Sequence, residues 1–544
     1  MRLQGGHRFV ALCVLAFLLV SSALSIPSCS NPPPPKKPER SPLYGGTLTI
    51  RLASDPSVIS PLANDRSARM VSQLLFSGLT RLNSHLLPVP DLADSWEISP
   101  DELNWTFHLR QGLKWHDGVP LTADDVLFTF QTLSRLEPTN ATEFDIKQVV
   151  SRVEKIDSST VKIVLRRRYA PLAAHMSIPI LPQHILRAVA PADIPKRTVT
   201  VGSGPFKFVE RKPQQSIVLE ANPSYYQGRP YIDKVAFLIT NDDGVAQKAL
   251  QDGQLMLAEF DKGGSDDLAK DTQIEANEFS ESGFFFVGFN LRKGKLFEDK
   301  NLRQAWAYGI DKAELVKTAT KNRGIPLWSD IPPVSWAYDP TVPTIQRDVA
   351  KAKQLLASSG WTGVDSDGIA VKGGQKLTVD LLVRNDAPDR VEAARLMAQQ
   401  LKEVGFGVKV VGADFGSVLA AKRKPPFDFD AILMGWTLNS DPDDYRLFHS
   451  SQIPNEKTPD LLNFVGFANE EFDQLTNQER GTLDVKKREE LYRGTQRILA
   501  QEMPYYFLWA NKILVAYNKR LQGPIELTSP AYLWNVEKWH INRS

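Results

Sequence analysis

Apolar residues along the chain switch repeatedly between the period of two that suits a strand and the period of 3.6 that suits a helix. Residues 47–52, 105–109 and 161–165 alternate apolar and polar side chains and predict strands. Residues 66–76 and 486–501 place their apolar side chains on one face and predict helices. This interleaving of the two patterns predicts an α/β fold.

The same alternation continues through the rest of the chain. Further predicted strands lie at 216–219, 235–239, 284–291, 377–383 and 408–411, and further helices at 182–189, 301–309, 311–318, 349–356 and 390–404. Thr122 and Asp125 have the spacing of a capping box, which predicts a helix start. Because hairpin-like and βαβ-like spacings both occur, mixed sheets are expected.

The N-terminal residues have the three parts of a secretory signal peptide. Arg2, His7 and Arg8 precede an apolar run over 9–24, and small residues follow before Cys29. The run is shorter than the roughly 20 residues that span a bilayer. We therefore expect residues 1–28 to be a cleaved signal peptide, with an N-terminal membrane-spanning anchor as the alternative.

Cysteine usage points to a lipid anchor. Cys13 lies inside the apolar run, and the only other cysteine, Cys29, follows Ile26-Pro27-Ser28. This segment resembles the lipobox of bacterial lipoproteins, which implies lipidation of Cys29. The remaining chain would then hold no disulfide, no thiolate nucleophile and no cysteine metal site.

Proline and charge dominate the next segment, residues 30–44. Such a sequence cannot bury a core, and its prolines favour an extended chain of about 3 Å per residue. Residues 29–44 are therefore predicted to be a lipidated cysteine and a spacer of roughly 40–50 Å. A PxxP ligand for a partner domain is the alternative.

Net charge excludes one class of partner. The 544 residues carry a formal charge of +2, whereas a nucleic-acid-binding domain needs a clustered basic surface. The short basic runs at 166–168 and 422–424 are typical of solvated loops. We expect no nucleic-acid partner.

No catalytic or metal-binding constellation is present in the sequence. Trp115-His116-Asp117-Gly118 holds a His–Asp pair, but its glycine and its place between a predicted strand and helix favour a structural turn. The eight histidines lack metal-ligand spacing, and His449 is the one that follows a candidate binding motif. No GxSxG elbow or phosphate-binding loop occurs. The sequence predicts no enzyme, no metal and no cofactor.

A series of short motifs carries a family resemblance. In chain order they are GGTL at 45–48, LRQGLKWHDG at 109–118, LTADDV at 121–126, GSGPF at 202–206, NPSYY at 222–226, FNL at 289–291, RQA at 303–305, GID at 309–311, residues 355–361, and EMP at 502–504. Each motif is weak alone, but their order over nearly the whole mature chain is specific. The chain resembles the family 5 extracellular solute-binding proteins, the peptide and nickel class of ABC importers.

The resemblance implies a two-lobed periplasmic-binding-protein-like fold of the hinge-closing class II type. Lobe one would cover 45–286 and return over 508–544, lobe two would cover 287–507, and a subdomain inserted in lobe one would span about 65–199. A small-molecule or peptide ligand would bind between the lobes and be passed to ABC permease subunits. The protein would be a monomer, lipid-anchored in the bacterial cell envelope and facing the periplasm or the exterior.

Residues 435–445 are expected to decide specificity, because they follow a predicted strand and should emerge at its end. In peptide-binding relatives an aspartate three residues after Trp436 pairs with the ammonium of the peptide. Here Asn439 holds that position, so either Asp441 replaces the aspartate or the ligand has no free ammonium there. Helix capping by Asp441, Asp443 and Asp444 is the alternative.

Two further side chains are candidate ligand contacts. Arg384 ends the predicted strand 377–383, where the resemblance implies an arginine on the ligand carboxylate, although Asn385 follows it in place of proline. Trp436 is a candidate apolar wall. A surface position for Arg384 and core packing for Trp436 are the alternatives.

We therefore predict a solute-binding subunit that captures peptides or peptide-like solutes. The alternatives are a non-peptide solute such as a metal chelate, an oligosaccharide or an opine-like compound, a secreted hydrolase using Asp441 with Asp444, and a receptor or chaperone that never transfers its ligand.

Overall fold

The computed structural model describes residues 43–63, 65–136, 146–260, 265–528 and 531–542. The predicted signal peptide, the predicted lipidation site Cys29 and most of the proline-rich segment lie outside the described residues. Within the described part, no helix combines the length and the apolar character that crossing a bilayer requires.

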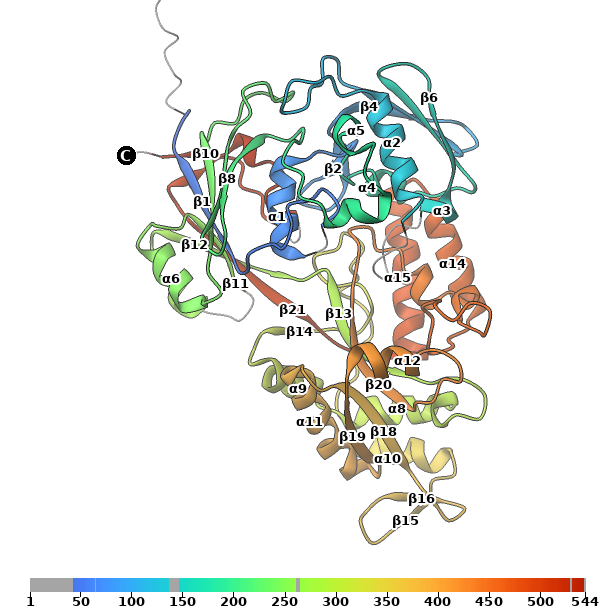
Figure 1. Ribbon diagram of the computed structural model, residues 1–544. Helices are drawn as coiled ribbons and strands as arrows, with labels where there is room; N and C mark the ends of the chain where they lie inside the picture. Colours follow the sequence, from blue (N-terminus) through green and yellow to red (C-terminus); the bar gives the residue numbers. More distant parts are fainter. Residues whose placement is uncertain (1–42, 64, 137–145, 261–264, 529–530, 543–544) are drawn as a thin grey trace, which may run out of the picture. The chain divides into compact units, whose positions relative to one another are not determined.

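A mixed sheet dominates the described part of the chain (Figure 1). Its central path, in spatial order, is β19 (Gly407–Ala413), β18 (Thr378–Arg384), β20 (Ala431–Thr437), β13 (Gly283–Phe289), β21 (Tyr505–Asn518), β11 (Leu257–Phe260), β1 (Thr47–Leu52), β10 (Lys234–Ile239), β9 (Ser216–Ala221) and β8 (Phe206–Lys212). Strand β18 pairs in parallel with β19 and β20, and β1 pairs in parallel with β10 and β11. Strand β13 pairs antiparallel with β20, and β9 pairs antiparallel with β10. The predicted mixed sheet is confirmed.

Strand β21 belongs to both halves of this sheet. Its first residues, from Tyr505 to Trp509, pair with β13, and its last residues, from Leu514 to Asn518, pair with β11 and with β12 (Ile274–Ser280). Strand β14 (Gly324–Pro326) joins β21 in between. Figure 1 shows β21 running from the elements around β20 to those around β11. The chain therefore passes between two groups of elements twice, once between β12 and β13 and once within β21.

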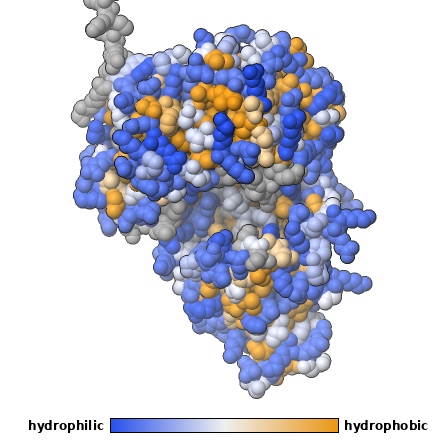
Figure 2. Space-filling view, viewed as in Figure 1, coloured by the Kyte–Doolittle hydropathy of each residue, from blue (hydrophilic) through white to orange (hydrophobic). Residues whose placement is uncertain are grey.

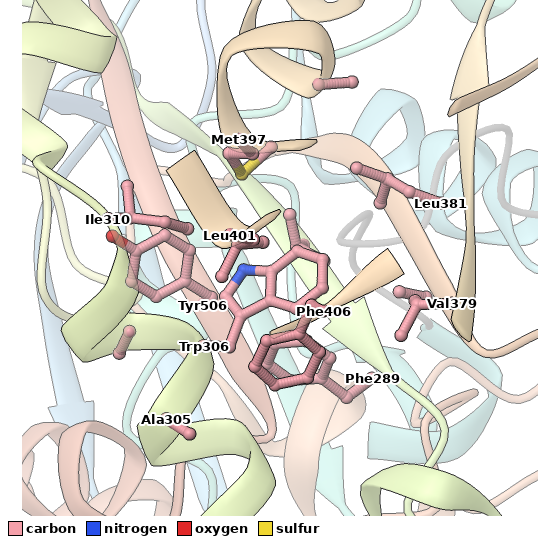
Figure 3. Close-up of a cluster of buried hydrophobic side chains, with 14 of the residues drawn as sticks. Phe289, Ala305, Trp306, Ile310, Val379, Leu381, Met397, Leu401, Phe406 and Tyr506 are labelled. Atoms are coloured by element: carbon pink, nitrogen blue, oxygen red, sulfur yellow. The ribbon is translucent and has the colours of Figure 1, made fainter. Parts of the chain in front are cut away.

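Four helices cover the half of the sheet that contains β18, β19 and β20. They are α8 (Lys300–Gly309), α9 (Lys312–Thr320), α10 (Val349–Ser358) and α11 (Pro388–Val404). Trp306 is fully buried at the centre of their core, with its ring centroid 5.6–5.8 Å from those of Phe289, Phe297 and Phe406 (Figure 3). A buried aromatic cluster of this kind fixes the helices on the sheet.

A second core lies around β1. Helix α1 (Arg66–Leu75) buries Met70, Val71, Leu74 and Leu75 against β1, β8 to β10 and the C-terminal segment. Asp65 caps this helix through a 2.7 Å bond from the Ala68 N–H.

A third core forms between Leu79 and Ile180. Its sheet has the order β4 (Ala93–Ile98), β5 (Asn104–Leu109), β7 (Thr160–Leu165) and β6 (Val150–Lys155). Helix α2 (Ala123–Leu133) packs on it and begins with the predicted capping box, in which the Thr122 N–H donates to Asp125. The chain leaves the second core after α1 and returns to it after residue 180, as an inserted subdomain does.

The remaining elements are short or peripheral, apart from two helices at the site. They are α3 (Ile146–Val149), α4 (Leu172–His175), α5 (Gln183–Leu186), α6 (Asp243–Gln251), α7 (Ser265–Leu268), α12 (Ala420–Lys422), α13 (Tyr445–Phe448), α14 (Glu470–Gly481), α15 (Val485–Glu502), β2 (Thr80–Leu82), β3 (Pro88–Pro90), β15 (Gly363–Val364), β16 (Ala370–Lys372), β17 (Gln375–Lys376), β22 (Leu521–Gln522) and β23 (His540–Ile541). Figure 2 shows that the drawn face is mainly hydrophilic, with apolar side chains in limited patches.

Candidate ligand-binding site

The predicted specificity motif leaves β20 beside the segment that passes between the two halves of the sheet. Thr437 pairs with Gly283, and the Leu438 N–H donates to the Ser282 carbonyl oxygen over 2.9 Å. A Cβ atom at Gly283 would lie 2.6 Å from the Trp436 carbonyl oxygen, so only glycine allows this approach of the two backbones. The motif is therefore held directly on the crossing segment.

The two crossing segments are bonded to each other. The Glu281 N–H donates to the Asn511 carbonyl oxygen over 2.8 Å, and the Asn511 amide donates to the Glu281 carboxylate over 3.0 Å. Trp509 Nε1 donates to Asn511 Oδ1 over 3.0 Å. Any hinge motion of the two halves must turn about this pair of bonded segments.

Trp436 is mostly occupied by protein contacts. It is 9% exposed, stacks on Phe286 with a centroid distance of 6.2 Å, and donates through Nε1 to the Tyr505 hydroxyl over 3.3 Å. The Arg423 guanidinium lies 5.7 Å from its ring centroid. Core packing accounts for most of this side chain, so only an edge of the ring is left for a solute.

Asn439 is partly buried next to the crossing segment. Its carbonyl oxygen accepts from Ser282 Oγ over 3.4 Å. Its side-chain amide makes no hydrogen bond to any residue that the structure describes. A polar group in this state is available to a solute.

Asp441 is paired inside the protein. Both of its oxygens accept from Arg488, over 2.8 and 2.9 Å, and the two side chains are 4% and 5% exposed. The Tyr492 hydroxyl also donates to Asp441 Oδ1, over 3.5 Å. This bidentate pair with Arg488 neutralises the negative charge of Asp441, which was the candidate partner of a solute ammonium.

Asp443 links the segment after β20 to the core that forms between Leu79 and Ile180. Asp443 Oδ2 accepts from the Tyr169 hydroxyl over 3.2 Å and lies 3.1 Å from Arg480 Nε. The Ala170 N–H donates to the Arg480 carbonyl oxygen over 2.7 Å. Asp443 also accepts from the Tyr445 N–H over 3.3 Å, so it serves the start of α13, as the capping alternative implies.

Asp444 holds the N-cap position of α13, but its side chain makes no capping bond. It is 2% exposed and lies near Glu479 and Asp330. Burial raises the pKa of Asp444 and of Glu479 well above the usual range, and the charges of the neighbouring carboxylates add to the effect. Burial also raises the pKa of Asp330 to about 7. This acidic cluster therefore binds protons that the unfolded chain would release.

Asp330→Asn is expected to stabilise the protein at alkaline pH. Because the folded-state pKa is raised, the stability associated with the protonated carboxyl is lost as the pH rises towards 7. One pKa unit corresponds to about 1.4 kcal/mol, so the gain in unfolding free energy should be about 2–4 kcal/mol at pH 8 and should vanish near pH 4. Urea unfolding across this pH range measures it. The exposed Asp460→Asn serves as control, and equal curves for both variants would refute the expectation.

Arg384 ends β18 on the strand next to β20. Since Val383 pairs with Leu433, Arg384 lies at the same sheet edge as the specificity motif. Its guanidinium binds both oxygens of Asp386, with Nη2 2.7 Å from Oδ2. A solute carboxylate would have to share or displace Asp386.

His116 and His449 both accept hydrogen bonds from the backbone. His116 Nδ1 accepts from the Gly202 N–H over 3.1 Å, and burial lowers the pKa of His116 to about 4. The predicted turn is confirmed, since the Gly118 N–H donates to the Trp115 carbonyl and Gly118 has φ +90°. His449 Nδ1 accepts from the Ser451 N–H over 3.1 Å. Among the described residues, no group of His, Cys, Asp or Glu side chains is arranged to hold a metal ion.

Sequence reasoning missed Tyr169, Arg480 and Arg488, which bind the acidic residues of the motif. The spacing of residues on α15 could have indicated these partners, because Arg488, Tyr492 and Thr495 share one face with the apolar Leu499. Polar residues at the spacing of a buried face point to a buried polar network.

These features define a class of protein. Two α/β units share a sheet, two bonded segments cross between them, and polar groups gather where the crossing occurs, as in a hinged solute-binding protein. The chain belongs to the bacterial extracellular solute-binding proteins of family 5, because the family profile "Bacterial extracellular solute-binding proteins, family 5 Middle" matches residues 88–456. The resemblance and the two-lobed fold predicted from the ordered motifs are confirmed.

Relatives support the assignment over nearly the whole chain. The oligopeptide-binding protein AppA of Bacillus subtilis is 31% identical over 98% of this chain and 99% of its own, and the dipeptide-binding protein of Escherichia coli is 28% identical over 80% of this chain and 83% of its own. The structure of AppA in complex with a nonapeptide covers 92% of this chain and 100% of its own, with a TM-score of 0.71. The structure of NikZ from Campylobacter jejuni in complex with Ni(L-His) has a TM-score of 0.70 at 28% identity, covering 91% and 99%.

Proposed function

We propose that this protein captures peptides or peptide-like solutes between its two lobes and delivers them to the membrane permease of an ABC importer. The observation that carries the proposal is the specificity motif held on the crossing segment by Ser282 and Gly283. A solute bound there touches both lobes, so its binding favours the closed form by its differential affinity for that form. The similarity to a relative whose structure contains a nonapeptide supports the peptide class.

Three side chains are proposed to meet the solute. The edge of Trp436 contacts an apolar part, the amide of Asn439 meets the amino end, and Arg384 meets a carboxylate in exchange for Asp386. Asp441 is proposed to act through Arg488 as a positioning residue rather than to touch the solute. With a neutral amide at the amino end, the site should tolerate peptides whose amino group is blocked.

The lobes, anchor and location follow the same proposal. Lobe one is proposed to end near Glu281 and to resume near Asn511, because the crossing bonds lie there, which differs by a few residues from the boundaries expected at 286 and 508. The inserted subdomain is proposed to span about 77–180, since α1 packs in the core of lobe one. Lipidation of Cys29 is supported by the signal-like N-terminus, and the absence of catalysis by relatives that are binding proteins. A monomeric state completes the proposal.

Calorimetry with matched peptides tests the proposal. Free-amino and N-acetylated versions of one peptide set are expected to bind the wild type with affinities within a few fold, because Asn439 carries no charge. Asn439→Asp is expected to raise the affinity for free-amino peptides about tenfold, through a charge-assisted bond, and to leave acetylated peptides unchanged or weaker. Ser440→Ala, one residue along, serves as control.

Two results would contradict the proposal. Binding of sugars or metal chelates in the absence of any peptide binding would assign the cleft to another solute. Turnover of a labelled peptide that disappears in Asp441→Ala would favour the hydrolase alternative.

A further inference from the structure

A cavity of about 310 Å³ lies within lobe one, among the described residues. It lies between α1, residues 76–82 and the C-terminal segment 531–537, and is partly open to the surface. Its apolar walls include Phe76, Leu82, Pro179, Tyr225, Leu533 and Trp534. A cavity of about 150 Å³ lined by apolar side chains can hold a benzene ring. The cavity in lobe one therefore has room for an aromatic ring together with the atoms that link it to a larger molecule.

Three hydroxyl groups at the cavity wall are hydrogen-bonded within the protein. The hydroxyls of Ser72, Thr80 and Ser177 donate to the carbonyl oxygens of Ser60, Ala173 and Ala174 over 2.7–2.8 Å. Each of these bonds turns a small polar side chain away from the cavity. The three side chains therefore present mainly carbon atoms to an occupant of the cavity.

Two of the charged groups at the wall, Arg81 and Asp91, are also bound internally. Arg81 donates through Nη1 to the Trp534 carbonyl oxygen over 2.9 Å and to Glu537 over 3.1 Å, and through Nη2 to Gln227 over 2.7 Å. Asp91 accepts from the Tyr226 hydroxyl over 2.6 Å and from Gln227 over 3.1 Å. A polar occupant would be desolvated without gaining these partners, whereas an apolar occupant needs none.

The cavity and the specificity motif both lie near the crossing segment. Arg69 lines the cavity, and the charge of Glu281 acts on it. Glu281 belongs to the crossing segment, and the next residue, Ser282, donates to the Asn439 carbonyl oxygen. One wall of the cavity and the motif therefore both approach the same crossing segment.

We propose that this cavity is a subsite for one large apolar side chain of the bound solute, with an aromatic ring preferred. The inference rests on the proposed peptide-binding function and adds a specificity to it. Trp534 and Phe76 supply aromatic surface to the ring, and Arg81 and Glu537 neutralise each other in an ion pair, so that this pair offers no net charge to a charged side chain. Backbone recognition at the motif would then be combined with selection for one aromatic position.

Calorimetry with peptides on an alanine–serine background, in which a single phenylalanine is moved through every position, tests the subsite. One position of phenylalanine is expected to bind about tenfold to hundredfold more tightly than the background peptide. Lysine or glutamate at that position should give no gain. Ala531→Trp, which fills the cavity from a partly exposed wall position, should abolish the gain without changing the affinity for the background peptide.

The controls separate loss of the subsite from loss of folding. Ala531→Ser leaves the cavity open and should keep the gain, and Trp534→Phe should keep more of it than Trp534→Ala. If peptides bind but no position of phenylalanine improves binding, or if Ala531→Trp retains the full gain, the subsite is refuted while the proposed function stands. If no peptide binds at all, the proposed function falls and the subsite falls with it.

Discussion

Arg488→Met is expected to lower the free energy of unfolding by about 3–5 kcal/mol, because it leaves the buried carboxylate of Asp441 without a counter-charge. Arg488 is 4% exposed and holds four groups at once: both oxygens of Asp441, the Tyr492 hydroxyl at 3.0 Å and, through Nε, the Glu479 carbonyl oxygen at 3.0 Å. Methionine fills much of the same volume but replaces none of these donors. Urea unfolding followed by tryptophan fluorescence measures the loss.

Two controls show whether the stranded charge is the cause. Arg493→Met removes a partly exposed arginine of the same helix, paired with Glu489 over 2.8 Å, and should cost less than about 1 kcal/mol. The double variant Arg488→Met with Asp441→Leu removes both charges and should recover most of the stability. A double variant no more stable than Arg488→Met would show that packing, not charge, is decisive.

The fold was largely predictable because its elements are amphipathic and short-range signals mark their ends. The predicted strand 47–52 coincides with β1, and the predicted helix 66–76 agrees with α1 to one residue. The capping box at Thr122 begins α2 as expected. The long strand β21 was not predicted, because its residues are apolar without alternation, as is typical of a strand buried on both faces.

The candidate site was predictable in position but not in its contacts. The end of β20 and the end of β18 could be placed at one sheet edge, because parallel strands finish together. The partner of Asp441 could not be found, since Arg488 is 47 residues away and a helix pattern usually assigns arginine to the solvent. Likewise, nothing local to Asp443 indicates Tyr169, which belongs to the separate core between Leu79 and Ile180.

The motif at 202–206 acquires a physical meaning from its contacts with α1. A Cβ atom at Gly202 would lie 1.8 Å from the Leu75 carbonyl oxygen, and one at Gly204 would lie 2.5 Å from that of Leu74. The Gly204 N–H donates to the Leu75 carbonyl oxygen over 2.8 Å and so binds the last turn of α1. The two glycines let a loop pack directly on helix backbone, which is a contact that no side chain would permit.

Gly202→Ala is therefore expected to cost at least about 3 kcal/mol of unfolding free energy, or to prevent folding of lobe one. The added methyl group must displace the end of α1 or the loop, and either shift breaks two hydrogen bonds between Gly202 and His116. In these bonds the Gly202 N–H donates to His116 Nδ1 over 3.1 Å, and the His116 N–H donates to the Gly202 carbonyl oxygen over 2.8 Å. Gly412→Ala is the matched control, because the nearest atom to its new methyl group would be Asn385 Cβ at 3.5 Å, an ordinary contact. Soluble yield, circular dichroism and urea unfolding of both variants measure the difference. Equal stability of the two would mean that the loop at Gly202 yields without cost, and that its packing on α1 does not stabilise the lobe.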